Sequence, residues 1–388
     1  MFFKSAVLKL AFFEKKLRRF TNSEKYVAEI DGIRFLAIAA VVIFHSCGFY
    51  VVKMGLPVND FFNQHLLGYK GVHVFFVLSG FVISMPFAKG LRKVKPEFQI
   101  KNYYLRRLSR IEPPYVISTV AIFYFLVFVQ HKYTFAALFP YLIYSLTYTT
   151  HFFSDSLPII NMVLWTLEIE IQFYLLAPFI CYFIFGVVAN KNIRLIILSA
   201  AIISSSLLTY FFHLNQQTLL HNLNLFLAGL FITEFILQAP RFTINKTVTD
   251  IVCFLLLLII FSNSCEWYSA VYAALYSFVF ILFFVLVLLK GGIHTFLQNK
   301  FVTIIGGGCY SIYLIHTQII SLVGERILSV RFTPYYYLNE LICLMVFIAC
   351  ILPVALFFFV LVERPCMDKR WPNKLYAYVK KYTVKTIK

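Results

Sequence analysis

Long apolar runs, separated by short and mostly basic segments, make up nearly all of this chain. About 20 predominantly apolar residues suffice to cross a bilayer as an α-helix. Eleven segments approach that length, but the one at 135–150 is short and contains Pro140. The other ten are predicted to span, near 30–51, 69–88, 111–130, 163–188, 193–213, 219–237, 249–262, 269–289, 301–328 and 335–362. We therefore expect an all-α polytopic membrane protein with about ten transmembrane helices.

The basic residues indicate how the segment at 135–150 is used. Cytoplasmic loops of membrane proteins carry an excess of Lys and Arg. If 135–150 does not span, most of the 35 Lys and Arg fall on the same side as the N-terminus. Five remain on the other side (Lys53, Lys70, Lys132, Arg326 and Arg331), and Arg34 lies in the first helix. We predict that 135–150 is re-entrant or interfacial, with both termini cytoplasmic.

Composition supports the same class of protein. The chain is 61% hydrophobic and only 13% charged, which excludes a soluble domain. The net charge of +18 follows the loops and the termini, so it indicates membrane orientation and contact with lipids rather than nucleic-acid binding. Eight cysteines form no CxxC pair, and neither a disulfide framework nor a metal site is expected.

The order of segments predicts three parts. Residues 1–29 form a basic amphipathic segment on the cytoplasmic face, because they lack the apolar core and cleavage site of a signal peptide. Residues 30–362 form the membrane domain, and 363–388 form a basic cytoplasmic tail. No appended soluble domain is expected.

The first helix carries the most unusual polar pattern. Asp31, Arg34 and His45 interrupt the otherwise apolar stretch DGIRFLAIAAVVIFH. Arg34 and His45 are eleven residues apart, so they return to within roughly 20° of one helical face and lie roughly 16 Å apart along the axis. An ionisable group at mid-membrane is costly and marks a functional site by default. The alternative is a neutral histidine hydrogen-bonded to a neighbouring helix.

A second polar group lies in WTLEIEIQFY, at 165–174. Glu170 and Tyr174 are four residues apart and share a helix face, whereas Glu168 points to the opposite side. We predict that Glu170 lies at a depth comparable with His45 and orients its imidazole, with Glu168 elsewhere. An interhelical hydrogen bond that serves packing alone is the alternative.

Two further groups are candidates. Arg107 and Arg110 end a basic run at the start of the third helix, where guanidinium groups suit the phosphates of a nucleotide cofactor. Positive-inside retention explains the rest of that run. Ser79 lies in GVHVFFVLSGF, whose glycines allow close helix approach. His73, in the same segment, is expected to serve packing and interfacial solvation.

Together these segments resemble the acyltransferase-3 family of bacterial membrane O-acyltransferases. Arg34 and His45 match its Arg-x10-His signature, and Glu170 matches the glutamate of its Trp-Ser-Leu-x-x-Glu block. The other matching segments are GVHVFFVLSGF, RRLSRIEPPY, CYSIYLIH at 309–316, and the terminal Glu363-Arg364-Pro365. His73 and Thr166 depart from the pattern, which usually has Asp and Ser there.

The resemblance implies an activity and its participants. Acetyl-CoA, or another acyl-CoA, is the expected donor, and a hydroxyl of a surface glycan such as lipopolysaccharide or exopolysaccharide, free or lipid-linked, is the expected acceptor. His45 is then the catalytic base or acyl carrier and Glu170 its support, while Arg34, Arg107 and Arg110 bind CoA. Asp31, Ser79 and Tyr174 are further site candidates. The expected location is the bacterial inner membrane.

A proton-coupled transporter of glycans or lipids is the alternative function. Buried His, Glu and Arg would then form a proton relay. Such transporters usually show two hydropathy-matched halves with broken helices, and this chain shows none.

Overall fold

The computed structural model describes residues 17–19, 26–55, 68–92, 100–153, 157–238, 245–262, 270–289, 293–327, 332–368 and 371. Within these ranges every regular element is helical, as predicted. The predicted terminal segments 1–29 and 363–388 lie largely outside the described residues. The helices are α2 (Ala28–Lys53), α4 (Gly71–Leu91), α5 (Ile100–Tyr124), α6 (Phe135–Leu146), α7 (Thr150–Phe153), α8 (Trp165–Tyr182), α9 (Lys191–Phe211), α10 (Leu219–Gln238), α11 (Lys246–Ser262), α12 (Ala270–Leu288), α13 (His294–Leu297), α14 (Lys300–Gly307), α15 (Cys309–Ile327), α16 (Tyr336–Phe358) and α17 (Arg364–Cys366).

Eight helices in the described part of the chain are long and apolar enough to cross a membrane. The two other predicted spans are also helical, but each differs from an ideal span. Helix α11 has 17 residues, and the span predicted near 301–328 is divided at Gly308 into α14 and α15. The fold is therefore that of an all-α polytopic membrane protein.

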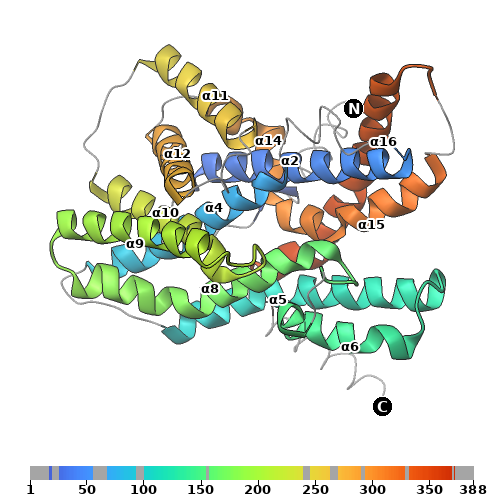
Figure 1. Cartoon of the computed structure of the whole chain (residues 1–388), viewed down its shortest axis with the longest axis horizontal. Helices are drawn as coiled ribbons and strands as arrows, with labels where there is room; N and C mark the ends of the chain where they lie inside the picture. The colour runs from blue at the N-terminus through green and yellow to red at the C-terminus, as the bar shows by residue number, and fades with distance from the viewer. Residues whose placement is uncertain are drawn as a thin grey trace, which may run out of the picture.

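Helix α6, from the segment predicted to be re-entrant or interfacial, has 12 residues. At 1.5 Å per residue it is roughly 18 Å long, well short of a bilayer's hydrocarbon core. Leu138 and Leu142 pack against Ile122 and Phe123 near the end of α5. Figure 1 shows α6 at the lower right, beside the end of α5.

Helix α5 begins earlier than predicted. The third span was predicted to begin near 111, but the helix starts at Ile100 and includes part of the basic run. Tyr103 Oη donates a hydrogen bond to the carbonyl oxygen of Tyr174 at 3.1 Å, and Tyr104 Oη donates to that of Leu175 at 2.8 Å. These bonds join the first turns of α5 to α8, so Arg107 and Arg110 lie on an ordered helix.

Helix α2 lies at the centre of the bundle and contacts α4, α13, α14, α15 and α16 (Figure 1). Two glycines allow close approaches near the start of α2. A Cβ atom at Gly32 would lie 2.4 Å from the carbonyl oxygen of Leu297, and one at Gly306 would lie 1.8 Å from that of Asp31. The backbone next to Arg34 is therefore held from both α13 and α14.

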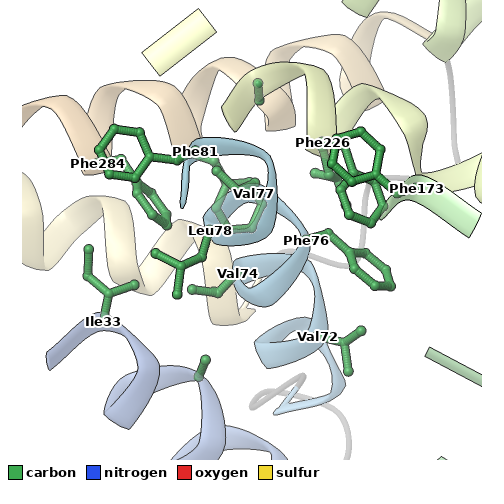
Figure 2. Close-up of a cluster of buried hydrophobic side chains, with 14 of the residues drawn as sticks. Ile33, Val72, Val74, Phe76, Val77, Leu78, Phe81, Phe173, Phe226 and Phe284 are labelled. Carbon is green, nitrogen blue, oxygen red and sulfur yellow. The ribbon is translucent and has the colours of Figure 1, made fainter. Parts of the chain in front are cut away.

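Helices α4 and α10 share the most extensive interface in the described part of the chain. Figure 2 shows Phe76 of α4, Phe173 of α8 and Phe226 of α10 stacked together. The ring centroid of Phe226 lies 4.9 Å from that of Phe76 and 4.1 Å from that of Phe173. Gly80 and Gly229 face each other beside this cluster, which lets the two backbones approach. This packing fixes α4, and with it Ser79, against α8 and α10.

Substituting Gly80 with alanine is expected to lower the unfolding midpoint in detergent. A Cβ atom there would lie 2.2 Å from the carbonyl oxygen of Phe226, and backbone cannot move aside cheaply. Overpacking of this kind costs about 1–3 kcal/mol or more. The control is Gly308→Ala, whose Cβ would lie 3.6 Å from its nearest neighbours, both side chains. Equal midpoints for the two variants would contradict the proposed close packing of α4 on α10.

Ion pairs and one hydrogen bond join several of the segments that were predicted to be cytoplasmic. Glu234, fully buried near the end of α10, pairs with Arg92 after α4 and with Arg194 in α9, the latter at 3.0 Å. Near the start of α2, Glu29 pairs with His294 at 2.8 Å. Trp371 Nε1 donates a hydrogen bond to the carbonyl oxygen of Ser109 at 2.9 Å. The helix ends within each group therefore lie together.

Candidate active site

A cavity of about 110 Å³ lies between α2, α4, α5, α8 and α15. We call it the arginine cavity, because three arginines from two helices line it. Hydrophobic and aromatic side chains form much of its remaining wall, among them Phe75, Leu167 and Tyr313. It brings together six of the residues predicted from the sequence: Arg34, Ser79, Arg107, Arg110, Glu170 and Tyr174.

Glu170 is the carboxylate of the arginine cavity. Ser79 Oγ and Tyr174 Oη both donate hydrogen bonds to Glu170 Oε1. Within the described ranges, Glu170 Oε2 makes no hydrogen bond. Two hydroxyls from α4 and α8 thus fix the carboxylate and leave one oxygen available to a ligand.

Glu170 lies in the second turn of α8 and lines the arginine cavity. Most of the residues just before this helix are buried: Ile160, Asn161, Val163 and Leu164 are all at most 2% exposed, whereas Met162 is exposed. Asn161 Nδ2 donates a hydrogen bond to the carbonyl oxygen of Leu314 at 2.8 Å, which anchors this segment to α15.

The arginines are held by neighbouring groups. The guanidinium of Arg107 lies over the ring of Tyr174, 5.3 Å from its centroid, in a cation–π arrangement. Asp31 does not line the cavity; its carboxylate pairs with Arg34 and also with Arg19, the latter at 3.2 Å. Tyr26 Oη donates a further hydrogen bond to Asp31 at 3.0 Å. Asp31 is therefore a positioning group for Arg34.

His45 lies farther along α2 and is not part of the cavity wall. Its Nδ1 atom lies 3.0 Å from Nε2 of His316, on α15. The hydrogen bonds of Glu170 within the described residues go to Ser79 and Tyr174 and not to His45, so the orientation of His45 by Glu170 stays a prediction. The sequence analysis missed His316 as a site residue, although the CYSIYLIH segment that ends on it was recognised.

Two other polar residues lie away from the cavity. Glu168 faces the opposite side of α8, as its spacing predicted, and accepts hydrogen bonds from the backbone nitrogens of Thr150 and His151 at 3.3 and 3.5 Å. It therefore caps α7. His73 is only 7% exposed and lies 3.4 Å from Tyr276 Oη, so its predicted packing role is confirmed but interfacial exposure is not.

Comparison with known proteins identifies a family model that matches residues 27–364, described as an acyltransferase domain. These residues include every side chain of the candidate site described above except Arg19 and Tyr26. No solved structure gives a significant match.

Several curated relatives are similar to the chain. It is 28% identical to a peptidoglycan O-acetyltransferase (OatA) of Listeria monocytogenes, over 48% of this chain and 29% of the relative. It is 24% identical to a putative O-acetyltransferase of Staphylococcus aureus strain COL, over 86% of this chain and 57% of the relative. It is 26% identical to the O-acetyltransferase OatA of strain NCTC 8325, over 82% and 55%. The chain spans about half the length or less of these relatives.

Proposed function

The chain belongs to the acyltransferase-3 family, and from this membership we propose that it is a membrane O-acetyltransferase using acetyl-CoA as donor and a glycan hydroxyl as acceptor. The single observation that carries the proposal is the arginine cavity, where three guanidinium groups and one carboxylate meet between five helices. Both the family and this arrangement fit acyl transfer better than simple packing.

The arginine cavity is suited to the phosphate groups of CoA. Guanidinium groups bind phosphate in bidentate geometry and keep their charge at any physiological pH. Arg107 and Arg110 are three residues apart on one face of α5, opposite Arg34 of α2. The basic residues around these helix ends favour a cytoplasmic position for the part of the arginine cavity that the arginines line. Acetyl-CoA is found in the cytoplasm. Both termini are then cytoplasmic.

His45 is the proposed base. It lies roughly 16 Å from Arg34 along α2, a distance that the long pantetheine arm of CoA can bridge from its phosphates to its thioester. His45 accepts the proton of the acceptor hydroxyl, whose oxygen forms a bond to the acetyl carbon as the carbon–sulfur bond breaks. The proton then passes to the departing thiolate, and the products are an acetyl ester and CoA thiol. A histidine that carries the acetyl group transiently is the covalent variant of this path.

The acceptor is proposed to be a cell-surface glycan. One of the relatives is named as a peptidoglycan O-acetyltransferase, which supports a glycan for this chain at the level of substrate class. Lipopolysaccharide, exopolysaccharide and lipid-linked precursors all present such hydroxyls, and we propose the bacterial inner membrane as the place of transfer.

Release of CoA thiol by the purified protein tests this proposal. In detergent no gradient exists, so a transporter has no driving force, whereas an acetyltransferase still turns over. We expect thiol release from acetyl-CoA that increases when a glycan-containing membrane extract is added. A folded protein that releases no thiol under either condition would favour the proton-coupled transporter.

Single glutamine substitutions of the two glutamates of α8 distinguish a role in the site from a role in the stability of the fold. Glu170→Gln removes the carboxylate that two hydroxyls fix in the arginine cavity, and we expect kcat/KM to fall by about 10- to 100-fold. Glu168→Gln, two residues away, weakens the cap of α7 and is expected to lower the unfolding midpoint with kcat/KM nearly unchanged. Equal activity losses in the two variants would contradict a specific role for Glu170.

A further inference from the structure

A pair of histidines, His45 and His316, links helix α2 to helix α15 near the arginine cavity. His316 of α15 is fully buried, and its Nε2 atom lies 3.0 Å from Nδ1 of His45. The ring of His316 also lies 5.8 Å from that of Tyr313, which lines the arginine cavity. The pair therefore lies one helical turn beyond the cavity wall.

The backbone determines which nitrogen of His316 carries hydrogen. His316 Nδ1 lies 2.9 Å from the carbonyl oxygen of Tyr313 and 3.1 Å from that of Ile312. A carbonyl oxygen can only accept, so His316 Nδ1 must be the protonated nitrogen. In the neutral ring, His316 Nε2 then has a lone pair and acts as an acceptor.

The tautomer of His45 follows from this. Because His316 Nε2 accepts, His45 Nδ1 carries the hydrogen and donates it across the 3.0 Å contact. His45 Nε2 is then the unprotonated atom with a lone pair. Within the described ranges no side-chain hydrogen bond is seen at this atom, and the His45 side chain is only partly buried.

We propose that His316 is the positioning residue of the transfer reaction: it holds His45 in the tautomer and orientation that present Nε2 as the base. This inference rests on the proposed function. His316 has the place that a carboxylate has in a Ser-His-Asp triad, although a neutral imidazole stands there instead. Two carbonyls fix His316, His316 fixes His45, and His45 acts on the substrate.

The proposal accounts for every proton in the step. The hydroxyl proton of the acceptor moves to His45 Nε2 as the new carbon–oxygen bond forms and the carbon–sulfur bond of the thioester breaks. His45 then carries a positive charge, which the bond from its Nδ1–H to His316 Nε2 stabilises. The same proton leaves His45 Nε2 for the thiolate, so both histidines return to their starting tautomers.

Two amide variants of His316 test this arrangement. The carboxamide of glutamine reaches about as far as Nε2 of histidine, so the oxygen in His316→Gln can still accept from His45. The carboxamide of asparagine reaches only as far as Nδ1, so His316→Asn can satisfy the backbone carbonyls but not His45. We expect His316→Asn to lower kcat by about 10- to 100-fold with KM for acetyl-CoA nearly unchanged, and His316→Gln to retain most of the activity.

A packing control, together with wild type and His45→Ala, makes the outcomes of this test distinct. Ile320→Val removes one methyl group from a buried residue one turn away on α15, and is expected to leave kcat unchanged. All variants are compared at equal folded fraction, measured by thermal unfolding. If wild type turns over and His45→Ala does not, but the Asn and Gln variants are equally active, the role of His316 is contradicted while the proposed function stands. If wild type itself fails to turn over, the proposed function fails.

Discussion

His45→Ala lowers kcat for acetyl transfer by about 10³-fold if His45 is the base of the reaction. The substitution removes the imidazole that contacts His316 and whose Nε2 atom is the proposed base. Binding of acetyl-CoA is expected to be nearly unchanged, because Arg34, one of the proposed phosphate-binding arginines, lies roughly 16 Å away along α2. The measurement is kcat and KM for acetyl-CoA in detergent.

Val42→Ala is the matched control for His45→Ala. Val42 lies three residues earlier on α2 and is 7% exposed, so its truncation also removes buried side-chain volume from the same helix. We expect a lower unfolding midpoint and an unchanged kcat. A His45→Ala protein that is folded and fully active would exclude His45 from the chemistry.

The double variant Arg107→Ala and Arg110→Ala raises KM for acetyl-CoA by about 100-fold or more. A hydrogen bond to a charged group is worth about 1.5–3 kcal/mol, and two such contacts to phosphate are lost. The two arginines adjoin the same cavity, so their effects are not expected to add fully. The maximal rate is expected to fall less than the affinity, since neither arginine lies near His45.

Arg106→Ala controls for the loss of basic charge. Arg106 adjoins Arg107 in sequence but is exposed and does not line the cavity. We expect its KM to stay within about twofold of wild type, because an exposed charge is screened by solvent. An acetyl-CoA analogue that lacks the 3′-phosphate gives a further comparison. It should bind to wild type more weakly than acetyl-CoA does, and this difference in affinity should be smaller for the double variant. Equal KM increases for Arg106→Ala and for the double variant would indicate an effect of bulk charge rather than of a specific site.

The helices were largely predictable from the sequence, because an apolar run of the right length has no other stable form in a bilayer. The predicted span near 219–237 is α10 (Leu219–Gln238), and the rejected segment at 135–150 is the short α6. The start of α5 was not predictable. It depends on two tyrosine hydroxyls that bond to α8, and hydropathy does not report such contacts.

The composition of the site was also predictable, but its connections were not. Helical spacing placed Glu170 and Tyr174 on one face and Glu168 on the other, and the structure agrees. The partners of Glu170 could not be predicted: its hydrogen bonds go to Ser79 and Tyr174 beside the arginines, and its role towards His45 stays a prediction. His316 escaped notice because its partner is 271 residues away in sequence. Only tertiary packing shows that contact.

Transfer of labelled acetyl from acetyl-CoA into glycan, by the purified wild-type protein, tests the central claim most directly. The account predicts label in the glycan fraction as an ester released by mild base, absent with His45→Ala and reduced with the double arginine variant. Folded wild-type protein that neither binds acetyl-CoA nor moves label into any glycan fraction would contradict it.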